Sequence, residues 1–174
     1  MKRRLALFVV VCLVSVSTVV VAQNFKFKFI HEFLSGYEEA PLTLSTSGNG
    51  EFHARISHND TRIQYQLSYS DLEGNVTQAH IHLGAKGIAG GISIFLCSNL
   101  GNGPAGTQAC PPAPATITGT LTAEGVIGPA AQGITAGQFD ELIEAIRAGV
   151  TYVTVHSTLY PGGEIRSQID HVGH

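Results

Sequence analysis

The sequence predicts an all-β fold: an antiparallel Greek-key-like sandwich or barrel of about seven to nine strands with one short amphipathic helix. Two patterns carry this prediction. Apolar and polar residues alternate in a series of short segments, which is the period of a strand with one buried face. Glycine, proline, asparagine and aspartate residues separate these segments at close spacing, as turns do in antiparallel folds.

The predicted strands follow one another along the chain. The first shows strict alternation of phenylalanine and lysine from Phe25 to Phe29. The turns after the later strands are rich in glycine, asparagine and proline, so each strand is short. The further predicted strands are Glu51–Ser57, Arg62–Ser70, Val76–His82, Gly91–Cys97, Ala115–Thr122, Thr151–His156 and Glu164–Ile169.

One segment departs from the strand pattern, and we expect a helix at about residues 136–148. Thr135 and Gln138 have the spacing of a capping box, in which two side chains satisfy the first free backbone groups of a helix. An apolar stripe at helical spacing predicts that the helix packs on the core and covers an opening of the fold. The stripe consists of Phe139, Leu142, Ile143 and Ile146, and Gly149 ends it.

The first twenty-two residues predict a secretory signal peptide. Three basic residues, Lys2, Arg3 and Arg4, precede an apolar stretch, and Ala22 ends a small-residue cleavage pattern. An uncleaved membrane anchor is the alternative, because the apolar run approaches the length of a spanning helix. We expect a secreted or otherwise extracytoplasmic protein, in the periplasm or at the cell exterior, with no membrane span after cleavage.

Composition narrows the classes of partner and cofactor. Beyond the signal the chain keeps 7 basic and 13 acidic residues, a formal net charge of −6. Such a chain has no electrostatic attraction for nucleic acid or anionic lipid. The sequence shows no phosphate-binding loop, so we expect no nucleotide cofactor. Asn59 and Asn75 begin glycosylation sequons.

Cys97 and Cys110 are the two cysteines beyond the predicted signal. They bracket a glycine-rich loop, which together with export predicts a disulfide between them. Such a bridge would remove about 3 kcal/mol of loop entropy from the unfolded chain. A metal-binding or redox thiol pair is the alternative.

Three histidines are the main candidates for a functional site. His80 and His82 lie two positions apart in a predicted strand, so their side chains share one face. His156 ends another predicted strand, on the face opposite its valines. Neutral imidazole is a good ligand for both copper and zinc, so the pattern indicates a site for one such ion. An ordinary polar strand face in contact with solvent would show the same pattern, and this alternative stays open.

Four further residues are candidates for an additional ligand or for supporting contacts. Glu39 or His53 would be the fourth ligand. Glu164 and Arg166 follow a proline-glycine turn and share one strand face, where they can orient a substrate or a ligand histidine. The alternative is a structural pair of residues, which form an ion pair with each other or hydrogen-bond to a neighbouring loop.

Four blocks in the chain resemble the CHRD domain family, first described in chordin and widespread in exported microbial proteins. The blocks are Leu34–Pro41, Ala79–Gly84, Tyr152–Ser157 and Tyr160–Gln168. The resemblance covers about residues 32–170, after a lead-in strand at 23–31 and before a short histidine-containing tail at 171–174. Positions that recur in the family correspond here to Glu39, His80, His82, His156, Glu164 and Arg166.

The resemblance also shows departures. The family usually has glycine where this chain has Leu83 and Ser167, and the segment from Cys97 to Cys110 resembles a local insertion. Chordin binds growth factors, but a shared fold does not carry that binding to a separate exported domain.

We therefore expect an extracytoplasmic binding or structural module with a mononuclear copper or zinc site. Its expected partner is an extracellular protein or a component of the cell envelope. One alternative is a copper-dependent redox enzyme of the superoxide-dismutase type, which needs an open coordination position. The other is a metal-free protein–protein interaction domain.

Overall fold

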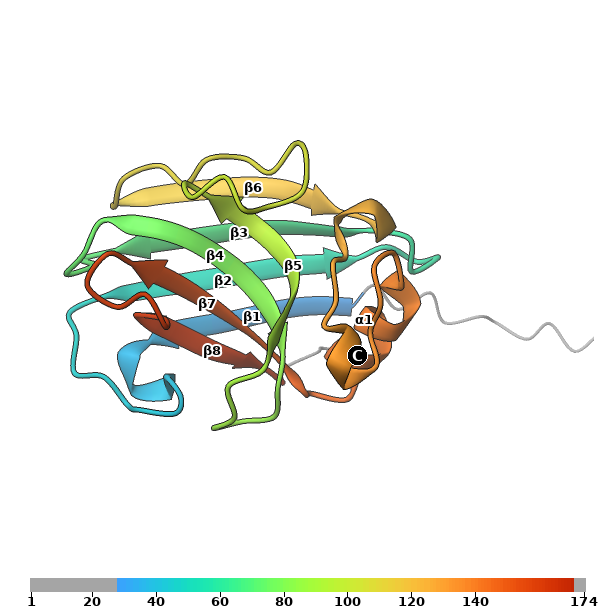
Figure 1. Cartoon of the computed structure of the whole chain (residues 1–174), viewed down its shortest axis with the longest axis horizontal. Coiled ribbons are helices and arrows are strands. Elements are labelled where there is room, and N and C mark those ends of the chain that lie inside the picture. Colours follow the sequence, from blue (N-terminus) through green and yellow to red (C-terminus); the bar gives the residue numbers. More distant parts are fainter. Residues whose placement is uncertain (1–27, 171–174) are drawn as a thin grey trace, which may run out of the picture.

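The computed structural model describes residues 28–170 of the 174-residue chain. Eight strands form one antiparallel sheet, which curls into a nearly closed barrel (Figure 1). The all-β prediction is confirmed, and the barrel is the architecture formed. The strands are β1 (Lys28–Ser35), β2 (Asn49–Ile56), β3 (Ile63–Ser70), β4 (Val76–Leu83), β5 (Gly91–Ser98), β6 (Ala115–Leu121), β7 (Thr151–Ser157) and β8 (Ile165–Ile169).

Seven of the observed strands agree with predicted ones to within two residues at each end. The first strand is the exception, because β1 continues to Ser35 and pairs with β2 along its whole length. The predicted boundary at residue 31 therefore falls inside β1. Residues 25–27 of the predicted strand, and the predicted signal peptide, lie outside the described residues.

The order of strands in the sheet is β5-β4-β7-β8-β1-β2-β3-β6. Figure 1 shows β5, β4, β7 and β8 in front of β1, β2, β3 and β6. The chain crosses over after β3, so β4 pairs with β7 instead of with β3. This crossover brings His80 and His156, 76 positions apart, onto neighbouring strands.

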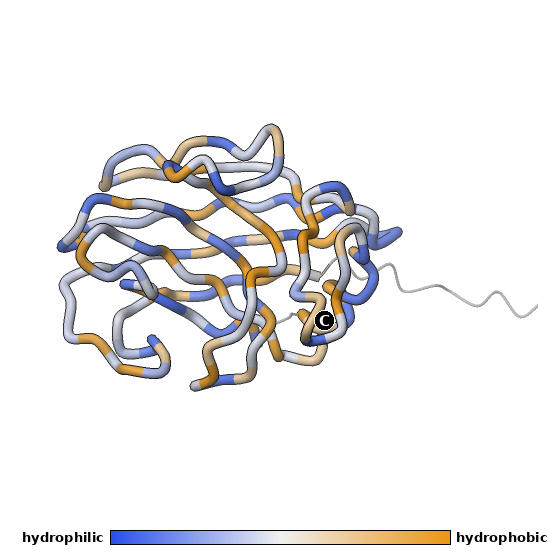
Figure 2. The backbone as a smooth tube through the Cα atoms, in the orientation of Figure 1, coloured by the Kyte–Doolittle hydropathy of each residue, from blue (hydrophilic) through white to orange (hydrophobic). Residues whose placement is uncertain are grey.

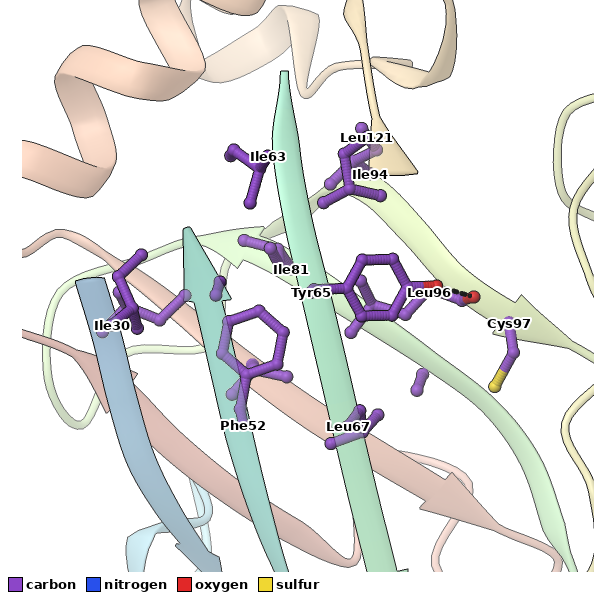
Figure 3. Close-up of a cluster of buried hydrophobic side chains, with 14 of the residues drawn as sticks. Ile30, Phe52, Ile63, Tyr65, Leu67, Ile81, Ile94, Leu96, Cys97 and Leu121 are labelled. Carbon is purple, nitrogen blue, oxygen red and sulfur yellow. Dashed lines mark hydrogen bonds between the residues drawn. The ribbon is translucent and has the colours of Figure 1, made fainter. Parts of the chain in front are cut away.

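Apolar side chains from both layers fill the barrel interior. Figure 2 shows hydrophobic and hydrophilic residues alternating along the strands. In Figure 3, Phe52 and Tyr65 from one layer point toward Ile81 and Leu96 from the other. The Tyr65 hydroxyl donates a hydrogen bond of 2.7 Å to the Leu96 carbonyl, which ties β3 to β5 across the core. Burial of such side chains, about 1.5–3 kcal/mol each, makes the barrel a rigid support for its outer face.

A loop bridges the seam between β5 and β6, the two ends of the strand order. The Gln108 amide donates hydrogen bonds to the Leu96 carbonyl of β5 (3.2 Å) and the Thr118 carbonyl of β6 (3.1 Å). A disulfide between Cys97 and Cys110 holds this loop against β5, as predicted. The loop thus covers backbone groups that an unpaired sheet edge would expose.

The helix α1 (Phe139–Arg147) covers one end of the barrel (Figure 1). Its four stripe residues are all buried in the core, as expected. The helix begins at Phe139 instead of residue 136, because Gly137 has a left-handed φ of 85°. The Gln138 side chain still accepts hydrogen bonds from the Thr135 backbone N–H (2.6 Å) and hydroxyl (2.9 Å), so part of the capping box forms.

Three short 3-10 helices complete the structure: η1 (Gly36–Glu38), η2 (Ala123–Gly125) and η3 (Ala130–Gln132). Among residues 28–170, none of the helices has the length and hydrophobicity needed to cross a membrane.

Candidate metal centre

The outer face of β4, β7 and β8 carries polar side chains that are buried. In the register of these strands His80 lies opposite Thr154, which lies opposite Arg166. His80, His82 and His156 are 0%, 7% and 5% exposed. Apolar and polar residues therefore alternate along β4 and β7 as predicted, but loops cover the polar face of these strands. The alternative of a solvent-exposed polar face does not hold for these three histidines.

The three imidazoles converge on one another. One nitrogen of each ring lies within 4.8 Å of one nitrogen of each of the other two. His80 Nδ1 and His156 Nε2 stand 3.3 Å apart. Two nitrogens bound to one tetrahedral zinc ion at its usual bond lengths also stand about 3.3 Å apart. The spacing of this pair therefore matches one edge of a tetrahedral metal site.

Backbone carbonyls fix the proton positions of two of the rings. His82 Nδ1 donates to the Gly90 carbonyl at 2.9 Å, and His156 Nδ1 donates to the Pro161 carbonyl at 3.0 Å. A carbonyl oxygen only accepts, so both neutral rings carry their proton on Nδ1 and their lone pair on Nε2. The lone pair of His156 faces His80 Nδ1 at 3.3 Å. Metal-bound histidines are oriented in the same way by an outer acceptor.

Burial holds all three imidazoles neutral. Burial, with the nearby His156 and His82 rings, lowers the pKa of His80 to about 2. Burial lowers the pKa of His82 to about 4, although its hydrogen bond to Gly90 acts in the opposite direction. Burial likewise lowers the pKa of His156. Neutral imidazole is the form that binds a metal ion, so no proton competes for these nitrogens near neutral pH.

Arg166 and Tyr152 support the loop that orients His82. The Tyr152 ring stacks on the His82 ring with 4.8 Å between centroids, and the Arg166 guanidinium lies 3.5 Å from the centre of the Tyr152 ring. Arg166 also donates hydrogen bonds to the carbonyls of Ile88 (3.1 Å) and Ala85 (3.3 Å). These carbonyls belong to the β4–β5 loop that also contains Gly90, so Arg166 positions His82 through this loop.

Glu39 lies over the same polar face, beside Thr154. The Thr154 hydroxyl donates a hydrogen bond of 2.7 Å to Glu39 Oε1, and Glu39 is 8% exposed. Burial raises the pKa of the Glu39 carboxyl, while Thr154 and the Arg166 charge lower it. A Cβ atom at Gly163 would lie 2.6 Å from this carboxylate, so the Glu39 side chain would have to shift if residue 163 were not glycine. The Gly163 φ of 133° requires glycine.

Glu164 and Arg166 do not pair with each other, although they share one strand face. The Glu164 carboxylate accepts hydrogen bonds from the Thr46 hydroxyl (2.9 Å) and the Glu73 backbone N–H (2.6 Å). Glu164 thus ties the loops before β2 and after β3 to the β7–β8 turn. Arg166 instead bonds to the β4–β5 loop. Of the two forms of the structural alternative, the ion pair is not formed, and the hydrogen bonds to neighbouring loops are.

The structure places His53 away from the three buried histidines. His53 lies on β2 in a separate, more exposed group with His31 and Glu51. Glu39 is not among the residues whose ligand atoms converge with the three histidines.

Sequence reasoning missed Tyr152 and the carbonyls of Gly90 and Pro161. The alternation along β7 placed Tyr152 on the face of His156, but backbone carbonyls leave no trace in a sequence pattern.

The match to known families covers the barrel. Residues 32–169, from within β1 to the end of β8, match the CHRD domain. The chain belongs to the CHRD domain family. All three converging histidines of this CHRD domain fall inside the matched segment. No curated protein and no solved structure matches the chain.

Proposed function

We propose that this CHRD domain binds one copper or zinc ion through His80, His82 and His156, and that it acts outside the cytoplasm as a binding or structural module. One observation carries the proposal. His82 Nε2, the ring nitrogen that keeps its lone pair when Nδ1 bonds to Gly90, is buried and lacks a hydrogen-bond partner among the described residues. Leaving a buried polar atom unpaired costs about 1–3 kcal/mol, and a bound ion would remove this cost.

The donor set favours copper or zinc over harder ions. The three converging ligands are all imidazole nitrogens, and a site for magnesium or calcium would use oxygen ligands instead. Three protein ligands would leave a fourth tetrahedral position for water or an external ligand. The Gly90 and Pro161 carbonyls would keep the ligand rings in the orientation that metal binding requires.

The disulfide supports export. Disulfides persist in oxidising compartments and are rare in the cytosol, and the Cys97–Cys110 bridge closes a loop of this barrel. In such a compartment copper and zinc reach the protein from the surroundings. The partner we propose is an extracellular protein or a component of the cell envelope.

The test measures metal content of untagged protein with its disulfide intact. The protein is loaded with copper or zinc and then desalted in a glycine buffer, which removes weakly held ions. We expect about one ion per chain in the wild type, none in His80→Ala or His156→Ala, and about one in the control His58→Ala, which changes an exposed histidine. Circular dichroism verifies that each variant is folded.

A spectroscopic measurement keeps the test valid if the variants fail to fold. Electron paramagnetic resonance of the copper-loaded wild type should show three nitrogen ligands from histidine. A wild-type chain that retains no ion, or a retained ion with fewer than three histidine nitrogens, would overturn the proposal. The first of these results would support the metal-free interaction domain.

The same preparation tests the redox alternative. Superoxide turnover by the copper-loaded protein, lost in His156→Ala, would replace the binding module with a redox enzyme. A copper-loaded protein without such turnover would support the module.

A further inference from the structure

A second group of metal-ligating side chains lies on the outer face of β1 and β2. His31 on β1 is the direct cross-strand partner of His53 on β2, and Glu51 lies two positions before His53 on the same strand face. One ligand atom from each of the three residues lies within 4.8 Å of the other two. The pattern of alternation along β1 and β2 therefore builds a second cluster, separate from the buried histidines.

One pair of these ligand atoms already has the spacing that a metal ion imposes, and a second pair is close to it. Glu51 Oε2 lies 3.1 Å from His53 Nε2 and 3.7 Å from His31 Nε2. Ligand atoms held by one zinc ion at its usual bond lengths stand about 3.0–3.4 Å apart. Small side-chain rotations on an exposed face are enough to bring all three atoms to this separation.

Ring contacts hold His31 in place. Its ring stacks on the His53 ring with centroids 4.0 Å apart, and the Phe33 ring packs on it at 4.6 Å. These contacts orient both imidazoles with Nε2 toward the Glu51 carboxylate. Less side-chain freedom is then lost when a ligand binds, which favours binding.

We propose that His31, Glu51 and His53 form a second, solvent-accessible site for a divalent copper or zinc ion. Two imidazoles and a carboxylate suit both ions, and copper is the tightest binder of the divalent first-row metals. On binding, each neutral imidazole offers Nε2 to the metal and carries its proton on Nδ1. The remaining coordination positions are filled by water.

Exposure distinguishes this site from the buried one. The side chains of His31, Glu51 and His53 are 47%, 47% and 44% exposed, whereas the buried histidines are covered by loops. An ion at the exposed site therefore enters and leaves without any movement of the barrel. The exposed site exchanges its ion quickly and loses it to a weak chelator, while the buried site retains its ion.

The test maps metal binding residue by residue in the full chain. Copper(II) is added to isotope-labelled protein without a competing chelator, and the loss of backbone amide signals in nuclear magnetic resonance spectra reports nearby copper. We expect signals around residues 30–33 and 50–54 to broaden. Glycine buffer should restore them, and zinc should shift the same signals. This region is distinct from β4 and β7, so the result does not depend on the buried site.

Matched variants assign the ligands. His53→Ala should lower the copper affinity of the exposed site at least about tenfold, and Glu51→Gln should weaken it while keeping the side-chain shape. His58→Ala changes another exposed histidine and should leave the site unchanged, as should the tail variant His171→Ala/His174→Ala. His53, Glu51 and His58 all lie outside the barrel interior.

Two results would overturn the proposal. Copper that leaves the signals of β1 and β2 intact would show that the cluster is an ordinary hydrogen-bonded surface group. Broadening that persists unchanged in His53→Ala and Glu51→Gln would assign the copper to other ligands.

Discussion

The stability of the metal-free protein should fall as the solution becomes acidic, because the barrel buries neutral histidines. The substitution that tests this is His82→Gln, which removes one buried imidazole and retains an N–H donor for the Gly90 carbonyl. The pKa of His82 is about 4 in the folded protein, below its ordinary 6.5. The unfolded chain therefore takes up a proton in a pH range where the folded chain does not.

The size of the effect follows from that difference. Stability from a lowered histidine pKa is fully present above pH 6.5 and is lost as the pH falls toward the folded pKa. The loss is about 1.4 kcal/mol for each pH unit in this window, or about 2 kcal/mol between pH 7 and pH 5 for His82 alone. His80 adds a loss of similar size, because its folded pKa is about 2.

Urea unfolding at the two pH values, with a chelator present and the disulfide intact, measures this loss. The difference in unfolding free energy between pH 7 and pH 5 should be smaller by about 2 kcal/mol in His82→Gln than in the wild type. The control His58→Gln changes an exposed histidine and should behave as the wild type does. Equal pH dependence in His82→Gln and the wild type would refute the argument that His82 is buried as a neutral ring.

Two further substitutions test the residues that support the site. Arg166→Met removes the hydrogen bonds to the carbonyls of Ile88 and Ala85, so the β4–β5 loop should loosen and metal affinity should fall about 10- to 100-fold, measured by competition with a chelator. Gly163→Ala places a methyl group 2.6 Å from the Glu39 carboxylate at a left-handed φ, so the free energy of unfolding should fall by about 3 kcal/mol in urea titrations.

Each of these substitutions has a matched control, which makes the same change at another arginine or glycine. Arg62→Met removes an exposed guanidinium and should leave metal affinity unchanged. Gly162→Ala adds a methyl group with no atom within 4 Å and should be close to neutral. Arg166→Met with wild-type affinity would mean that the loop holds its conformation without the guanidinium. A neutral Gly163→Ala would contradict the close approach of Glu39.

The strands could be predicted because each depends on a local pattern. A strand such as β3 alternates apolar and polar residues, and turn formers end it, so its limits follow from a few neighbouring residues. The helix was predicted less accurately at its beginning. The capping-box spacing of Thr135 and Gln138 is local, but the left-handed conformation of Gly137, which delays the helix to Phe139, depends on the path of the surrounding chain.

The histidines of the candidate site could be predicted from the sequence, but the loops that surround them could not. Spacing placed His80 and His82 on one strand face, and the alternation along Thr151–His156 placed His156 on the polar face of another strand. Burial of this face depends on loops that fold over it, and loops have no regular period. The same reason explains why Glu164 and Arg166, neighbours on one face, bond to different loops.

The sequence by itself determined the all-β class, the limits of most strands and the imidazole side chains of the candidate buried site. These features depend on alternation, turn residues and side-chain chemistry, which act over a few positions. Tertiary structure alone decided that β4 pairs with β7, that loops bury the three histidines, and that His53 joins His31 on another face. Each of these depends on contacts between residues far apart in the chain, whose geometry is set only when the barrel closes.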